Sequence, residues 1–242
     1  ALGPEKIPGV IGLKAIHLVS REEGKKVPKT DSMYLDIGAA DKDEALALVR
    51  PGTYGSFLGE PEELGEGMLK AKAIDDRVGC AIMLSLLREE LPMDVTFAFT
   101  AQEEVGTRGA FAAAFSVKPD IALVLETTTA ADLPGVDDHR KVCAPGKGPV
   151  ISYMDRGTIY PRRLTQWLEQ LAAEAGIPTQ KKTLIAGGNE ARTVQTAGAG
   201  SEVMGISVAC RYLHSQAVTA SERDIEDTLR LVRLAVSRAG EL

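Results

Sequence analysis

The fold is best read from the stretch Val95-Thr96-Phe97-Ala98-Phe99-Thr100-Ala101-Gln102-Glu103-Glu104-Val105-Gly106. Its first six residues are apolar or β-branched, which predicts a buried strand over 95–100. The strand is followed by two adjacent carboxylates, Glu103 and Glu104, and then by a glycine. In α/β proteins, functional sites form beyond the carboxyl ends of strands. We therefore expect the two glutamates to lie at the functional edge of a sheet.

Three other positions also place a charged or metal-binding side chain at the end of a predicted element. Asp75 precedes a helix, Glu126 ends a strand, and His214 follows another strand. Taken singly, each has an ordinary explanation. Asp75 could cap the helix, because peptide dipoles there favour an anion, and adjacent glutamates often lie in a solvated turn. Taken together, they indicate a site for divalent metal ions.

The chemistry of such a site fits these residue types. Zn²⁺ accepts histidine nitrogen and carboxylate oxygen, commonly from three protein ligands, and leaves a position open for water. Two ions about 3.5–4 Å apart need a bridging carboxylate and lower the pKa of a bound water. Adjacent glutamates suit a divided role, in which one binds metal and its neighbour takes a proton from the water.

The composition excludes several other classes of protein. The 242 residues are 44% hydrophobic and carry a net charge of -6, and no run of lysine and arginine stands out. This argues against nucleic acid as a partner. No apolar run approaches the roughly 20 residues of a membrane span, so no membrane partner is expected. The three cysteines show no CxxC spacing, which favours buried thiols in a reducing, cytoplasmic compartment.

The rest of the chain alternates strands and helices, which predicts a sheet covered by helices on both faces. Residues 1–65 are rich in glycine, proline and short alternating runs, and we expect them to form a small β-rich module with one helix. The expected strands are 9–16, 32–37, 52–58, 95–100, 120–125, 179–184 and 203–210, and the expected helices are 45–49, 76–90, 107–115, 162–175, 189–196 and 221–239.

Six blocks of the sequence, in order and over nearly the whole chain, resemble the motifs of the tetrahedral (TET) aminopeptidases. These enzymes are also called glutamyl or deblocking aminopeptidases, and they often carry the label cellulase M or endoglucanase. The blocks are Ala73-Ile74-Asp75-Asp76-Arg77-Val78-Gly79, Ala101-Gln102-Glu103-Glu104-Val105-Gly106, Leu125-Glu126-Thr127-Thr128 with Asp132-Leu133-Pro134-Gly135, Gly146-Lys147-Gly148-Pro149, Gly187-Gly188-Asn189-Glu190-Ala191 and Arg211-Tyr212-Leu213-His214-Ser215.

The resemblance implies a metal-dependent aminopeptidase that releases N-terminal residues from peptides. It assigns the general base to Glu103 and the bridging metal ligand to Asp75. Glu104 and His214 would complete one metal site, and Glu126 would bind the other ion, where the family more often has aspartate. The cofactors would be two divalent ions, Zn²⁺ or Co²⁺.

The resemblance also implies the domain organisation and the assembly. Residues 66–242 would form the catalytic α/β domain, a mixed sheet flanked by helices. Residues 1–65 would be part of an inserted, β-barrel-like dimerisation domain. Family members self-associate from dimers up to hollow dodecamers.

The sequence departs from the family pattern in its histidines. The family supplies a further ligand from a His-x-Asp motif that precedes the inserted domain, so roughly the first hundred residues of the pattern are absent here. His17 falls inside the insert, and His139 follows a Pro-Gly turn in a surface loop. A smaller departure is Glu190, where the family often has aspartate.

Two alternative functions remain open at this point. In the first, the chain is a truncated or degenerate relative that holds one ion, has no turnover and acts as a binding or assembly subunit. In the second, it is an endoglucanase-type glycosidase. That chemistry needs carboxylates on both sides of the scissile bond, which the adjacent Glu103 and Glu104 cannot provide, and the single tryptophan leaves few stacking platforms for sugars.

Overall fold

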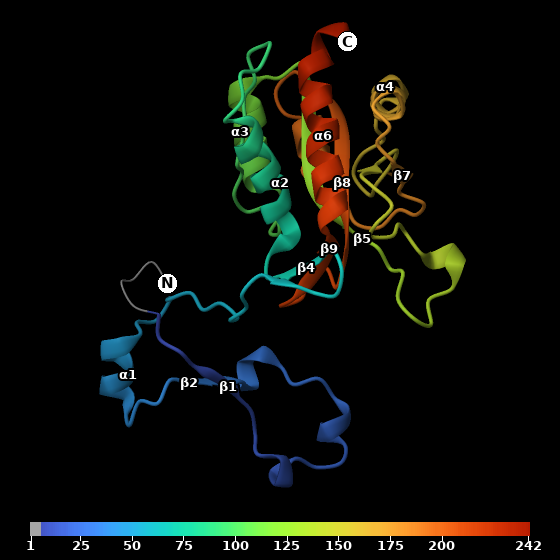
Figure 1. Ribbon diagram of the computed structural model, residues 1–242. Helices are drawn as coiled ribbons and strands as arrows, with labels where there is room; N and C mark the ends of the chain where they lie inside the picture. The colour runs from blue at the N-terminus through green and yellow to red at the C-terminus, as the bar shows by residue number, and fades with distance from the viewer. Residues whose placement is uncertain (1–5) are drawn as a thin grey trace. The chain divides into compact units, whose positions relative to one another are not determined.

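The computed structural model describes residues 6–242 (Figure 1), and its contacts divide the chain into two compact units, Ala1–Phe57 and Leu58–Leu242. Residues 1–5 of the predicted β-rich module lie outside the described residues. In the first unit, β1 (Val10–Gly12) pairs antiparallel with β2 (Tyr34–Asp36), followed by α1 (Lys42–Leu48). Residues 6–57 therefore hold a two-stranded sheet and no closed barrel.

The predicted helix of the first unit is present, but one predicted strand is wrong. The helix begins earlier than expected, because the side chain of Asp41 accepts a 2.9 Å hydrogen bond from the backbone N–H of Glu44 and caps it. The segment 52–58 forms no strand. Its β-prone residues, such as Tyr54 and Phe57, are exposed, and no neighbouring strand pairs with them in the described part of the chain.

The second unit contains a seven-stranded mixed sheet, which confirms the predicted fold class. β5 pairs with β8 in parallel, as β6 does with β7, whereas the other pairings are antiparallel. Hydrogen-bonded neighbours follow one another in the order β3 (Glu62–Glu63), β4 (Met68–Ala71), β9 (Val218–Ser221), β8 (Glu202–Arg211), β6 (Val150–Ile151) and β7 (Gln180–Lys181). β5 (Ile121–Thr129) also pairs with β8.

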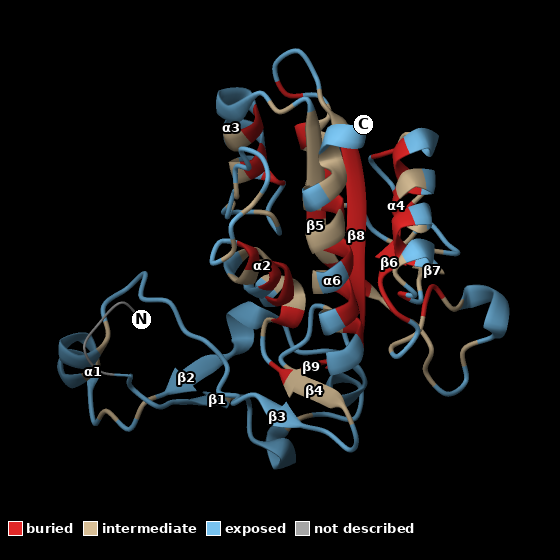
Figure 2. Cartoon of the chain, turned by 45° about the horizontal axis from the view of Figure 1, so that its top comes forward, coloured by how far each residue is buried: buried red, intermediate tan, exposed pale blue. Residues whose placement is uncertain are grey.

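Helices cover both faces of this sheet. Successive side chains of β8 point to opposite faces, and all its residues from Val203 to Cys210 are buried, as Figure 2 shows in red. One face packs against α2 (Ile74–Leu86), α4 (Arg162–Glu174) and α6 (Glu222–Arg238), and the other against α3 (Arg108–Val117) and α5 (Ala191–Val194). No helix formed by residues 6–242 has the length and hydropathy needed to cross a lipid bilayer.

The structure of residues 95–106 differs from the one predicted from the sequence. Residues 95–100 form no strand, and Phe99 is 47% exposed, so the predicted buried strand is wrong. The segment lines a cavity of about 760 Å³, and the opposite wall is β5. The edge of β5 that faces away from β8 has no strand partner within residues 6–242. A β-prone segment forms a strand only where a neighbour accepts its hydrogen bonds, and none is adjacent here.

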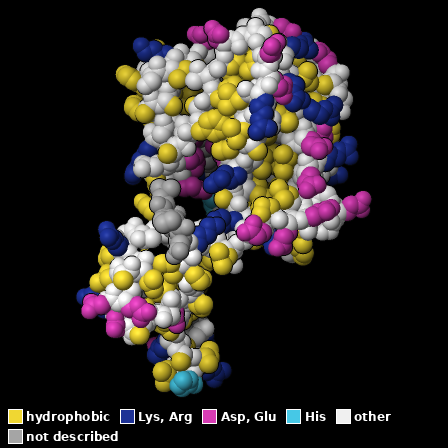
Figure 3. Space-filling view, turned by 60° about the vertical axis from the view of Figure 1, so that its left-hand side comes forward, with side chains coloured by type: hydrophobic (Ala, Val, Ile, Leu, Met, Phe, Trp, Pro, Cys, Tyr) yellow, Lys and Arg dark blue, Asp and Glu magenta, His cyan; other side chains and the backbone are white. Residues whose placement is uncertain are grey.

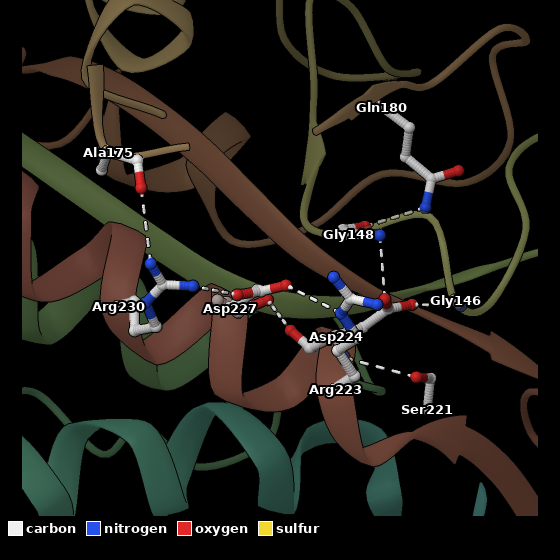
Figure 4. A network of polar contacts seen from close by, with 10 residues as sticks. Gly146, Gly148, Ala175, Gln180, Ser221, Arg223, Asp224, Asp227 and Arg230 are labelled. Atoms are coloured by element: carbon white, nitrogen blue, oxygen red, sulfur yellow. Dashed lines mark hydrogen bonds and ion pairs between the residues drawn. The ribbon is translucent and has the colours of Figure 1, made fainter. Parts of the chain in front are cut away.

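The N-terminus of α6 fixes the loop that leads into β6 (Figure 4). Ser221 caps the helix, as predicted, by accepting a 3.3 Å hydrogen bond from the backbone N–H of Asp224. The carboxylate of Asp224, which is 1% exposed, accepts hydrogen bonds from the N–H groups of Gly146 (2.7 Å) and Gly148 (2.8 Å). Gln180 donates to the carbonyl of Gly148 at 2.8 Å. This loop is therefore held from two sides.

Candidate metal centre

Three of the predicted ligands meet at one edge of the sheet. His214 Nε2 lies 3.4 Å from Asp75 Oδ2 and 3.4 Å from Glu104 Oε2. One donor atom from each of the three residues lies within 4.8 Å of the others. Two carboxylates and one imidazole are a donor set that Zn²⁺ and similar ions accept. The residues present therefore fit a divalent ion.

These ligands come from three separate parts of the chain. Asp75 lies in the first turn of α2, where its backbone departs from helical dihedrals. Glu104 lies in the turn that follows 95–100, and His214 lies in the loop between β8 and β9. The sequence placed each of them beside a strand end or a helix start, and the fold brings these ends together.

The structure adds a contact that the sequence analysis missed. Thr127, a buried residue of β5, donates a 2.9 Å hydrogen bond from Oγ1 to Asp75 Oδ1. The two oxygens of Asp75 are thus divided, one facing Thr127 and the other facing His214. A threonine inside a strand is an ordinary β-former, so no signal in the sequence marks this role.

Glu103, the predicted base, is partly buried beside the metal-binding group. Burial raises the pKa of its carboxyl, and the negative charges of Glu104, Glu190 and Asp75 raise it further. A carboxylate with a raised pKa is a better proton acceptor near neutral pH than an ordinary glutamate. The position suits a general base that works next to a bound ion.

Glu126 does not belong to the group of three ligands. It lies in β5 and lines the cavity together with Asp76, Glu103 and Glu190. Burial and the charges of Asp76 and Glu103 raise its pKa to about 9, and burial also raises the pKa of Asp76 to about 7. In Figure 3, which views the molecule from the side of α2 and α3, acidic side chains lie in a recess among exposed apolar ones.

Glu190 and Asp76 are held by neutral donors. Thr100 donates a 2.5 Å hydrogen bond to Glu190, and the backbone N–H of Gly79 donates a 3.0 Å bond to Asp76. Four carboxyl groups at one end of a cavity repel one another when ionised. A cation bound among them would relieve this repulsion.

The other two histidines and the three cysteines lie outside the group of ligands. His139 is exposed in the 3-10 turn Asp138–Arg140, as expected for a surface residue, and His17 is exposed within the first unit. Neither belongs to the group of ligands found among residues 6–242. The cysteines are all free, with Cys143 and Cys210 buried and Cys80 half-buried.

Comparison with known proteins places these observations in a family. A sequence profile of the M42 glutamyl aminopeptidases matches residues 2–231. The lysyl aminopeptidase of Pyrococcus furiosus is 31% identical over 232 residues, which cover 93% of this chain and 65% of that protein. This chain thus spans about two thirds of that relative's length.

Solved structures give the same result. An aminopeptidase from the archaeon Desulfurococcus kamchatkensis superposes with a TM-score of 0.88 at 33% identity, covering 95% of this chain and 64% of that one. The TET1 peptidase of Pyrococcus horikoshii, described as assembling into a tetrahedron or a large octahedral shell, gives 0.81 at 33% identity, covering 94% and 67%. The mixed sheet with its flanking helices is therefore the fold of this family.

Proposed function

Because the chain belongs to the M42 glutamyl aminopeptidase family, we propose that it carries the catalytic residues of a metal-dependent aminopeptidase acting on the N-termini of peptides. The observation that carries this proposal is the group formed by Asp75, Glu104 and His214, with Glu103 adjacent in sequence to Glu104. The family supplies the reaction class, and the group supplies a place where it could occur.

The side chains divide the work in the following way. Asp75, Glu104 and His214 would hold a divalent ion, which would supply Lewis acidity toward the scissile carbonyl and toward water. Glu103 accepts the proton of the attacking water and returns it to the departing amine. Thr127 orients the carboxylate of Asp75.

Asp75 and Glu126 would hold a second ion, and Zn²⁺ or Co²⁺ would serve in both sites. Asp75 and Glu126 alone give this ion only two protein ligands, fewer than the usual three. The cavity between 95–100 and β5 adjoins Glu126 and Glu103. The donor group found among residues 6–242 includes no counterpart of the ligand that the family takes from its His-x-Asp motif.

The second candidate is a chain that holds one ion and has no turnover, acting as a binding or assembly subunit. It is favoured by the small size of the ligand group, which omits Glu126. A glycosidase is disfavoured, because the site is built from two carboxylates and an imidazole around one point rather than from carboxylates on two sides of a sugar.

We also propose that the partners are peptide substrates and further copies of the chain, and that the protein works in the cytoplasm. Residues 1–65 would provide the dimerisation surface. Large apolar side chains are exposed on the first unit, including Val10, Tyr34, Leu35 and Tyr54. The shells formed by the TET1 peptidase are a precedent for such assembly.

The decisive experiment compares metal content with hydrolysis. The chain is loaded with Zn²⁺ or Co²⁺, the bound ions are counted, and a panel of aminoacyl amides is assayed with and without chelator. Glu103→Gln is the matched variant, and we expect it to keep the metal and lose the hydrolysis. A fully loaded chain that cleaves no aminoacyl amide would support the inactive alternative, and reducing sugar released from cellulose would support the glycosidase.

A further inference from the structure

The strand that carries Thr127 and Glu126 ends beside the strand that leads to His214. β5 and β8 are parallel, and their register runs as far as Thr129, which lies opposite Cys210. The backbone N–H of Ala130 then donates a 2.9 Å hydrogen bond to the carbonyl of Cys210. β5 ends at Thr129 and the chain runs on to Asp132, while β8 ends at Arg211.

An ion pair joins the two segments that follow β5 and β8 where they leave the sheet. Arg211 donates from Nε to Asp132 Oδ1 at 2.9 Å and from Nη2 to Asp132 Oδ2 at 2.7 Å. The side chains are 34% and 14% exposed, respectively. Two parallel N–H···O bonds fix both the distance and the orientation of a guanidinium, which a single hydrogen bond does not.

The loop that begins at Arg211 carries His214. Its backbone turns sharply. Tyr212 (φ 63°) and His214 (φ 59°) both adopt left-handed conformations, which are unfavourable for residues other than glycine. Such conformations persist only where the surroundings hold them. The side chain of His214 is 63% exposed, so packing around the imidazole does little to fix it.

We propose that the Asp132–Arg211 ion pair is a positioning device for His214, which holds the base of the loop so that the imidazole stays at the metal-binding group. The inference rests on the proposed metal-binding function, and it assigns a task to two residues that do not touch the ion. Arg211 lies three residues before His214, and Asp132 anchors it to the end of β5. The position of the loop is thereby tied to β5, the strand that also supplies Thr127 and Glu126.

A purely structural role is the competing explanation, and the chain offers a matched control. Arg233 and Glu89 form a second two-bond pair, at 2.8 and 2.7 Å, in which the arginine is about as exposed (39%) as Arg211 and the carboxylate is more exposed (32%) than Asp132. This pair joins α6 to the turn after α2 and includes none of the proposed ligands. Removing either carboxylate should cost similar stability, but only the loss of Asp132 should disturb the ion.

The test uses Asp132→Asn, Arg211→Lys and the control Glu89→Gln, with Zn²⁺ alone as the probe. Affinity is measured by competition with a chromophoric chelator, and the absorption spectrum of bound Co²⁺ reports coordination. We expect the first two variants to bind Zn²⁺ about tenfold more weakly, at the lower end of the roughly 10–100-fold loss that follows when a ligand loses a direct partner, because the pair acts on His214 only through the loop. Glu89→Gln should bind like the unmodified chain, and all three metal-free variants should melt within a few degrees of one another.

A double-mutant cycle with His214→Ala shows whether the pair acts through the histidine. Asp132→Asn should weaken binding in the unmodified chain and have no further effect once His214 is replaced. Equal losses in both backgrounds would overturn the inference, as would unchanged affinity in Asp132→Asn. If Asp132→Asn loses its cooperative unfolding transition, the same cycle with Arg211→Lys decides. An unmodified chain that binds neither Zn²⁺ nor Co²⁺ would overturn the proposed function as well.

Discussion

Thr127 and Asp75 are joined by a 2.9 Å hydrogen bond that links β5 to the first turn of α2. The contact matters because Asp75 is the proposed bridging ligand, and its second oxygen faces His214. A hydrogen bond from a buried hydroxyl limits the rotation of a carboxylate at small cost in stability. This relationship gives the most conservative substitution available at the site.

Thr127→Val removes the hydroxyl and keeps the shape of the side chain. We expect metal affinity to fall about tenfold, because a ligand that loses its orienting partner binds less well. The free energy of unfolding of the metal-free chain should change by about 1 kcal/mol, as for one hydrogen bond. Thr127→Ser, which keeps the hydroxyl, should restore most of the affinity, and equal behaviour of the two variants would contradict the role given to Thr127.

The pH dependence of stability follows from Asp76 and Glu126. Their folded-state pKa values, about 7 and about 9, lie above the usual values near 4 of an unfolded chain. Between these limits the folded state binds more protons than the unfolded state, so stability falls as the pH rises. Urea unfolding of the metal-free chain should therefore show a lower midpoint at pH 8 than at pH 5.5.

Two further measurements test whether Asp76 and Glu126 cause this pH dependence. Glu126→Gln should flatten the pH dependence, because the amide does not titrate. Added Zn²⁺ should raise stability more at pH 8 than at pH 5.5, since metal ligands must be deprotonated. A midpoint that rises with pH in the absence of metal would show that these carboxyl groups do not dominate.

Asp224 tests the network at the start of α6. Asp224→Asn keeps the size of the side chain but replaces one acceptor oxygen with a donor that faces a backbone N–H. We expect the free energy of unfolding to fall by about 1–3 kcal/mol, the range for a buried polar group left without a partner. Arg223 directly precedes Asp224 in the helix, and its side chain is largely exposed. Arg223→Ala should therefore change the free energy of unfolding by no more than about 0.5 kcal/mol. Comparable losses in the two variants would argue against the network.

Substitutions at two glycines of the same loop distinguish the cost of backbone strain from the cost of a steric clash. Gly146 and Gly148 both have positive φ, at 84° and 85°. A Cβ added to Gly148 would lie 2.0 Å from the carbonyl oxygen of Pro178, whereas one added to Gly146 would have no neighbour within 4 Å. Gly146→Ala should therefore cost only the backbone term, about 1–2 kcal/mol.

Gly148→Ala must also move Pro178, and its loss should clearly exceed that of Gly146→Ala. Thermal unfolding of the two metal-free variants provides the comparison. Equal melting temperatures would mean that the chain around Pro178 shifts without resistance.

The sequence predicted that Asp75, Glu104 and His214 come together, and it predicted the segments around them less well. Asp75, Glu104 and His214 were identifiable because ligand-type residues followed predicted elements, and the fold joins those ends. Thr127 and the Asp132–Arg211 pair were not, because their roles depend on which strands lie side by side.

The failed strand over 95–100 has a similar cause. Its composition favours a strand, as the sequence indicated, but a strand also requires a partner that local patterns do not specify. β8 was predicted well because it is flanked on both sides and buried throughout. β7 is far shorter than the predicted 179–184 and lies at the end of the strand order.

The wide separation of the ligands along the chain has a further consequence. Asp75 and His214 are more than half the chain length apart, yet they meet at one point. An ion bound to both would act as a cross-link between distant parts of the folded chain. Unfolding of the larger unit would then require the ion to leave. The concentration of free metal ion would therefore set the stability of this unit against heat and proteases.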